Sequence, residues 1–148
     1  LDGYDLVLID CPPSLGTLTR DALAASDLAI IVATPTYFGL QGAERAADEI
    51  EEIRKNHNKK LKLLGVLPNR VKSVAEEHDF RIKELGSIFK KQVLTPAIPD
   101  RIAFQQAESF GKPIEVFTEE NGQRFLDFHG NVIGVVKDYQ TSDLRFQI

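Results

Sequence analysis

Apolar residues along this chain follow two patterns that alternate from one end toward the other. Short continuous apolar runs predict strands that are buried on both faces. These runs are Tyr4–Ile9, Leu28–Ala33, Leu61–Leu67 and Gln92–Thr95. Between and after them, apolar residues recur at steps of three and four positions, which predicts amphipathic helices. The predicted helices are Thr17–Ser26, Leu40–His57, Val74–Phe89 and Ile102–Glu108.

Strands that alternate with helices are typical of an α/β fold, in which a mostly parallel sheet carries flanking helices. The chain shows no repeat, low-complexity tract or linker, so we expect residues 1–148 to form a single α/β domain. Residues 118–148 are less regular. Asn121–Tyr139 predicts a last helix, which Gly130 and Gly134 weaken, and Gln140–Ile148 has no readable pattern. Residues Gly111–Phe117 are expected to form a loop or an edge segment.

In a parallel sheet, ligands sit outside the carboxyl ends of the strands, so chemistry is expected just after each apolar run. Asp10 follows the first run directly, and a carboxylate there is costly unless it has a partner such as Mg²⁺. Pro12 and Pro13 fix the backbone of the next loop, and Gly16 lets a backbone N–H approach a phosphate. The competing interpretation is that Asp10 is simply a turn or helix-capping residue.

Charge and cysteine content narrow the function classes. The formal net charge of −4 argues against wholesale coating of nucleic acid, although a local basic patch could still bind it. Cys11 is the single cysteine, which excludes an internal disulfide and is most simply accommodated in a reducing cytoplasm. The three histidines, His57, His78 and His129, lie far apart on polar stretches, so we interpret them as surface or helix-end residues and not as metal ligands.

Four ordered segments of the chain resemble one protein family. The segment DCPPSLGTLTRDALAASD closely resembles the second phosphate-binding motif of the ParA/Soj/MinD ATPases, the deviant Walker-A branch of the P-loop NTPases. Three later segments are similar to further parts of the same family: TPTYFGLQGAERAADEIEEIRK, LKLLGVLPNRV and IPDRIAFQQAESFGKPIEVF. The resemblance covers about Tyr4 to Phe117 and implies a partial P-loop NTPase fold of the SIMIBI type.

The resemblance implies ATP and Mg²⁺ as cofactors and assigns roles to individual residues. Asp10 matches the aspartate that binds Mg²⁺, usually through water. The positions Pro12, Pro13 and Gly16 match the switch segment near the γ-phosphate. Asn69, with Arg70 beside it, matches the residue that recognises the adenine edge, and an amide offers the donor and the acceptor that adenine needs. The loop whose backbone flanks the base matches Pro99 and Asp100.

The family's first motif, a K-G-G-x-G-K-[ST] loop that holds phosphates, does not occur in the chain. In the family this loop precedes the DCPP strand, so we expect this chain to be the C-terminal part of a longer ATPase. Phosphoryl transfer depends on positioning and charge neutralisation. We therefore expect no catalytic residue within the chain and no ATP hydrolysis by the chain alone. Without the preceding strand of the family's sheet, we also expect an exposed sheet edge that could self-associate.

The family resemblance implies an ATP-dependent homodimer, non-specific DNA binding, a centromere-binding ParB-like partner and a cytoplasmic, nucleoid-associated location. The candidate DNA-binding residues are Lys59, Lys60, Lys62 and Arg101. The segment IPDRIAFQQAE departs from the family, because Asp100 and Ala103 stand where the family carries arginines. The alternative for the lysines is a solvated helix end where cations are favoured.

Two other functions fit parts of the sequence. A ParA-like remnant without enzymatic activity could keep the fold and act as an interaction module. A MinD-like division-site ATPase would need a basic amphipathic C-terminal helix that binds the membrane. The last predicted helix carries Arg124 and Lys137 but also Asp127 and Asp138, which does not favour a membrane-bound form.

Overall fold

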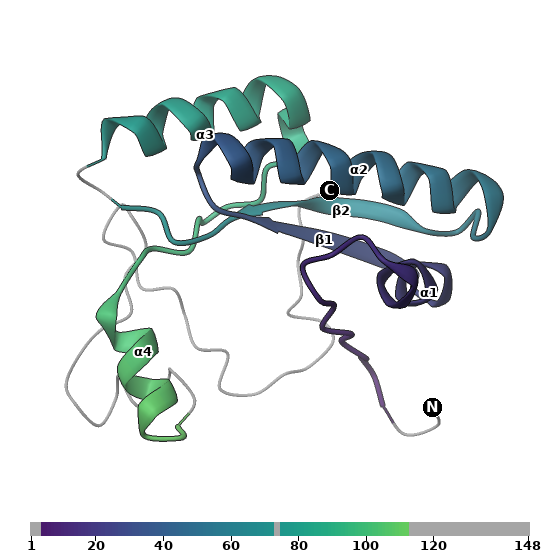
Figure 1. The fold of residues 1–148 in the computed structure, drawn as a ribbon, viewed down its shortest axis with the longest axis horizontal. Coiled ribbons are helices and arrows are strands. Elements are labelled where there is room, and N and C mark those ends of the chain that lie inside the picture. The colour runs from purple at the N-terminus through teal and green to yellow at the C-terminus, as the bar shows by residue number, and fades with distance from the viewer. Residues whose placement is uncertain (1–3, 73–74, 113–148) are drawn as a thin grey trace.

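The computed structural model describes residues 4–72 and 75–112 (Figure 1). Helices and strands alternate along this part of the chain. In order they are α1 (Thr17–Ala25), β1 (Leu28–Ala33), α2 (Tyr37–Asn56), β2 (Lys62–Pro68), α3 (Glu76–Phe89), the 3₁₀ helix η1 (Lys90–Gln92) and α4 (Ile102–Ser109). The two strands are parallel, paired from Leu28 with Lys62 to Ala33 with Pro68, and the register shifts between Ala29 and Ile30. The prediction of a parallel α/β arrangement is confirmed.

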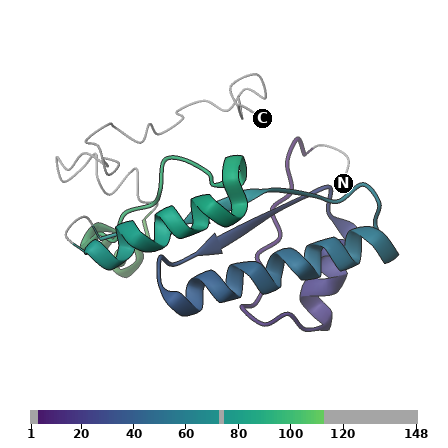
Figure 2. The same cartoon turned by 90° about the horizontal axis from the view of Figure 1, so that it is seen from above.

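Helices α2 and α3 cover one face of the sheet. Seen from above, they lie side by side over the strands (Figure 2). The core between these layers consists of buried aliphatic and aromatic side chains: Ile31, Ala33, Leu40, Ala43, Ile50, Ile53, Leu61, Val66, Leu85 and Phe89. Burying this apolar area drives the helices onto the sheet at roughly 25 cal/mol per Å².

The opposite face of β1 is not covered by the described residues. Ile31 and Ala33 are buried, whereas Leu28, Ile30 and Val32, which alternate with them, are 53%, 49% and 58% exposed. The prediction that β1 is buried on both faces is therefore wrong for the described part of the chain. Alternation places successive side chains on opposite faces, and α2 and α3 cover a single face.

The prediction of a buried strand at Tyr4–Ile9 is wrong. These residues form no regular element, and the side chains of Leu6 to Ile9 are between 49% and 83% exposed. In Figure 1 the segment follows its own course below the strand arrows. An apolar run has a tendency to be buried, but it becomes a strand only where a neighbour satisfies its backbone. Among the described residues, Tyr4–Ile9 pairs with neither β1 nor β2.

The fourth predicted strand, Gln92–Thr95, is reduced to a single parallel bridge between Val66 and Val93. Leu94 N–H donates to Val66 O at 2.8 Å, as in a ladder, and the next donation, to Pro68 O, comes from Ile98 N–H at 2.8 Å. In a regular ladder Pro96 would make that second bond. Pro96 has no N–H, so the chain departs from the sheet before Ile98 returns to it.

The helices agree closely with the sequence pattern. Helices α1 and α4 coincide with their predictions to within a residue at their ends. Helix α2 begins at Tyr37, before the predicted Leu40, because the hydroxyl of Thr36 caps it by accepting from Gly39 N–H at 3.1 Å. Helix α3 begins at Glu76. The predicted helix Asn121–Tyr139 and most of the segment Gly111–Phe117 lie outside the described residues.

Polar contacts fix α1 against the second half of α2. Arg20 lies 2.6 Å from a carboxylate oxygen of Glu49 and 2.9 Å from one of Glu52. The Glu49 oxygen is buried and faces Arg20 as an ion pair without hydrogen-bond geometry. The hydrogen bond to Glu52, followed by the charge of Glu49, raises the pKa of Arg20. The side-chain amide of Asn58 donates to the carbonyls of Leu23, Ala24 and Ser26, which holds the end of α1.

Candidate nucleotide site

The four residues predicted to contact the nucleotide base lie together at the carboxyl edge of β2. Two loops meet there, Asn69–Lys72 after β2 and Ile98–Asp100 before α4. Val71 N–H donates to Ile98 O at 3.0 Å, and Asp100 N–H donates to Val71 O at 2.9 Å, on either side of a parallel bridge between Val71 and Pro99. Asn69, Arg70, Pro99 and Asp100 are thus juxtaposed, whereas their role in binding stays a prediction.

Asn69 is held at the junction of β1 and β2. Its N–H donates to Ala33 O at 2.8 Å, and its side-chain oxygen accepts from Arg70 N–H at 2.9 Å. Arg70 has φ +58°, a left-handed conformation that is strained for a residue with a Cβ. The side-chain NH₂ of Asn69 makes no hydrogen bond within the described residues, so both hydrogens of this group are available to a ligand.

Buried apolar groups hold the two loops in place, and one exposed ion pair lies beside them. Val71 is 2% exposed, and Pro68 and Pro99 are also buried. The ammonium of Lys72 lies 3.7 Å from a carboxylate oxygen of Asp100. Both side chains are largely exposed, so this pair contributes little to stability.

The predicted magnesium and switch residues lie apart from this junction. Asp10, Pro12, Pro13 and Gly16 are all exposed. The loop is tied at its end, where the buried hydroxyl of Thr19 donates to Ser14 O at 2.7 Å. Within the described residues, no hydrogen bond or ion pair joins the Asp10–Gly16 segment to the Asn69–Lys72 loop. The expectation that Asp10 ends a buried strand is wrong, because Tyr4–Ile9 is not a strand.

The exposed carboxylate of Asp10 is the predicted ligand for Mg²⁺. In the part of the chain that the structure describes, no group of three or more His, Cys, Asp or Glu side chains could hold a metal ion. Mg²⁺ is usually bound by one or two carboxylates while it keeps waters and takes phosphate oxygens. The exposed carboxylate of Asp10 fits such an ion when a nucleotide supplies the other oxygens.

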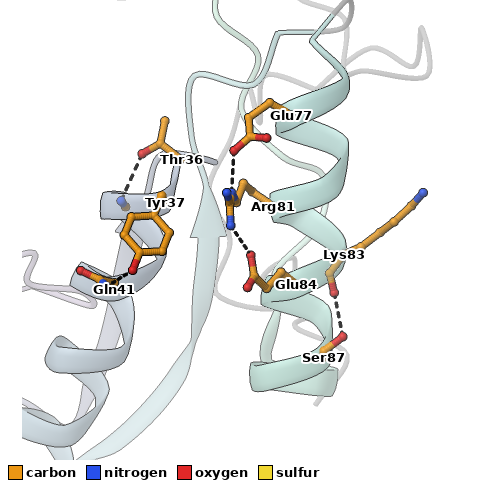
Figure 3. A network of polar contacts seen from close by, with 9 residues as sticks. Thr36, Tyr37, Gln41, Glu77, Arg81, Lys83, Glu84 and Ser87 are labelled. Carbon is orange, nitrogen blue, oxygen red and sulfur yellow. Dashed lines mark hydrogen bonds and ion pairs between the residues drawn. The ribbon is translucent and has the colours of Figure 1, made fainter.

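A polar network joins the beginning of α2 to α3, next to the carboxyl end of β1 (Figure 3). The guanidinium of Arg81 lies 5.4 Å from the ring centre of Tyr37 and 5.1 Å from that of Phe80. It donates to Glu77 and Glu84, both at 2.7 Å, and the bonds to Glu77 and then Glu84 raise the pKa of Arg81. This cation–π contact fixes how the first turn of α2 faces α3.

Sequence reasoning overlooked two residues of this region. It did not single out Arg81, whose partner Tyr37 belongs to another helix. It interpreted His78 as a surface residue, yet His78 Nδ1 accepts a hydrogen bond from Lys72 N–H at 3.0 Å. One available signal was the position of His78 in the first turn of α3, where a side chain can reach back to the preceding loop.

The candidate DNA-binding residues fall at two ends of the sheet. Lys59 and Lys60 precede β2 and Lys62 begins it, whereas Arg101 precedes α4 at the carboxyl edge. A strand of this length separates its ends by roughly 20 Å. All four side chains are exposed. The structure does not gather them into one basic surface.

None of the helices in residues 4–72 and 75–112 is both long and apolar enough to cross a membrane.

Comparison of the sequence with known proteins shows which family the chain resembles. The profile of a family described as "AAA domain" matches residues 1–63. The chain is 37% identical over 114 residues to the chromosome partitioning protein ParA of Myxococcus xanthus, which covers 77% of this chain and 40% of that protein. It is 34% identical over 115 residues to the sporulation initiation inhibitor protein Soj of Bacillus subtilis, covering 78% of this chain and 46% of Soj. The chain is a member of the ParA/Soj family. It spans about half the length of the curated relatives that it matches.

Solved structures support the P-loop NTPase type of fold. Cobyrinic acid a,c-diamide synthase from Mycobacterium smegmatis, solved with ADP and magnesium, aligns with a TM-score of 0.61 and 28% identity. The alignment covers 75% of the ParA/Soj-family chain and 51% of the synthase. Apo McdA from Cyanothece aligns with a TM-score of 0.57 over 73% of the chain and 44% of McdA, at 18% identity, and shares the fold alone.

Proposed function

We propose that this chain forms the base-recognition part of a ParA-type partition ATPase. The observation that carries the proposal is the junction of the Asn69–Lys72 and Ile98–Asp100 loops, which two backbone hydrogen bonds close. It presents the free NH₂ group of Asn69 beside Pro99 at the carboxyl edge of a parallel sheet, where nucleotides bind in such folds. Adenine would lie between these loops, with the amide of Asn69 at its polar edge.

The remainder of the proposal follows the family. Asp10 would hold Mg²⁺ through water, and Pro12, Pro13 and Gly16 would form the switch next to the γ-phosphate. The phosphate-binding loop, absent from this sequence, would belong to a preceding part of the ATPase. The proposed partition cycle also includes ATP-dependent homodimerisation, a ParB-like partner and a nucleoid-associated location. Non-specific DNA binding in this cycle would use Lys59, Lys60, Lys62 or Arg101.

Titration of the ¹⁵N-labelled chain with ADP, followed by NMR, tests base recognition. We expect shifts at the amides of Asn69–Lys72 and Ile98–Asp100, and the same shifts with adenosine, because the base makes these contacts. Asn69→Ala removes one or two hydrogen bonds and should weaken ADP about two- to tenfold or more. Asn56→Ala, at the exposed end of α2, is the matched control and should bind like the parent chain.

Guanosine provides the specificity test in the same titration. Its base edge reverses the donor and acceptor that adenine offers, so guanosine should produce much smaller shifts at these two loops. Equal shifts with guanosine, or unchanged ADP affinity in Asn69→Ala, would contradict adenine recognition by Asn69.

The chain alone is expected to show no ATP turnover above that of buffer. Asp10 supplies one carboxylate, and the sequence holds no lysine-containing glycine loop to neutralise the phosphates. Phosphate release from ATP and Mg²⁺ at high protein concentration is the measurement, with Asp10→Ala as the control for contaminating ATPases. Turnover that Asp10→Ala abolishes would show that the chain is a complete enzyme, contrary to this proposal.

A further inference from the structure

His78 makes the contact that links α3 to the loop after β2. Lys72 N–H donates to His78 Nδ1 at 3.0 Å, across six positions of sequence. An acceptor at Nδ1 means that this ring nitrogen carries no proton. Further along the same helix, Leu85 and Phe89 are buried in the core and anchor α3 to the sheet.

The Lys72 amide comes next in the chain after the Val71–Pro99 bridge. Before it, Asn69 N–H bonds to Ala33 O and Val71 N–H bonds to Ile98 O. Beyond Val71 the chain leaves the sheet, and the backbone donor that follows is the N–H of Lys72. Its bond to His78 therefore ties the end of the Asn69–Lys72 loop, two residues after the left-handed turn at Arg70, to the first turn of α3.

We propose that His78 is a positioning residue for base recognition: it holds the Asn69–Lys72 loop so that the amide of Asn69 faces the base. The inference rests on the proposed function, since it assumes that this loop contacts the nucleotide. His78 acts through the backbone of Lys72 and itself touches no nucleotide.

The contact depends on the charge state of the imidazole. A ring protonated on both nitrogens has no acceptor, so acid should break the bond to Lys72 N–H. Charged groups surround this position. Glu76, Glu77 and Asp79 share the first turn of α3 with His78, Arg81 lies one turn later, and the Lys72–Asp100 pair lies on the loop side.

Two substitutions at this position separate the acceptor from the ring. His78→Ala removes the acceptor. His78→Asn keeps an acceptor oxygen at nearly the same place as Nδ1, but it does not titrate. His57→Ala, at the exposed C-cap of α2, is the matched control for loss of a histidine.

The experiment uses the ¹⁵N-labelled 148-residue chain and measures two quantities from about pH 8 to about pH 5, the range in which histidine side chains change charge. The first is hydrogen exchange of the Lys72 amide, which needs no ligand. The second is the dissociation constant for ADP. We expect His78→Ala to speed exchange at Lys72 and to weaken ADP about two- to tenfold, as the loss of one hydrogen bond predicts. His78→Asn should restore both the slow exchange at Lys72 and the ADP affinity, and His57→Ala should change neither quantity.

The two readouts distinguish failure of this inference from failure of the proposed function. If the parent chain binds ADP and His78→Ala binds it equally well, the positioning role of His78 is overturned. A loss of ADP affinity in His78→Ala without faster exchange at Lys72 overturns it too. If His78→Ala speeds Lys72 exchange but the parent chain shows no ADP shifts at either loop, the proposed function itself fails, and the role of His78 in base recognition fails with it.

Discussion

Replacing Gly39 with alanine is expected to lower the free energy of unfolding by about 3 kcal/mol, at the upper end of overpacking substitutions. A Cβ at this position would collide with the carbonyl oxygen of Thr34 and would lie 2.7 Å from the Thr34 hydroxyl oxygen. The carbonyl cannot easily turn away, because it accepts from Thr36 N–H at 2.8 Å in the turn between β1 and α2. The first turn of α2 must therefore move or lose its cap.

Gly42, one turn later in α2, is the matched control. A Cβ there would have no heavy atom within 4 Å, so Gly42→Ala should stabilise the helix by up to about 1 kcal/mol. Urea unfolding followed by circular dichroism measures both variants. Destabilisation of both by similar amounts would show that α2 tolerates no alanine for a reason other than contact with Thr34. Gly39→Ala at parental stability would contradict the close approach itself.

Elements that are defined by local chemistry were the ones the sequence predicted well. Helix α1 and strand β1 were located to within a residue, because their apolar spacing is a property of their own short segments. Tyr4–Ile9 was predicted wrongly because an apolar run records a preference for burial and not the presence of a neighbouring strand. The run Gln92–Thr95 is shorter than predicted because Pro96 has no N–H to donate to β2, so the ladder stops after a single bridge.

In the candidate site too, some residues were predicted from the sequence and others were not. The family resemblance predicts Asn69, Arg70, Pro99 and Asp100 as base-contacting residues, and the structure brings their two loops together through hydrogen bonds that no sequence pattern shows. His78 was missed because its partner is a backbone N–H, which every residue except proline carries and which therefore leaves no mark in the sequence. Contacts made through the backbone are therefore harder to predict from the sequence than residues that match a family motif.

Gly65→Ala is expected to damage both the fold and the candidate site. A Cβ on Gly65 would lie 2.5 Å from the backbone oxygen of Gln92 and 2.7 Å from two side-chain carbons of Leu94. The segment that follows η1 would have to move away from β2, at a cost of about 1–3 kcal/mol. Its bonds from Leu94 N–H to Val66 O and from Ile98 N–H to Pro68 O would then lengthen or break. Because Ile98 leads directly into Pro99 and Asp100, ADP should lose its shifts at Ile98–Asp100.

Gly86→Ala separates the site effect from a general effect of alanine. Gly86 lies within α3, and a Cβ there would have no heavy atom within 4 Å, so this variant should gain up to about 1 kcal/mol and bind ADP normally. Urea unfolding gives the stability of each variant, and ADP titrations are compared only under conditions where both remain folded. If folded Gly65→Ala binds ADP like the parent chain, the Ile98–Asp100 loop does not contribute to base recognition. If it loses affinity as strongly as Asn69→Ala, the two loops act as one binding unit, as expected from the Val71–Pro99 bridge that joins them.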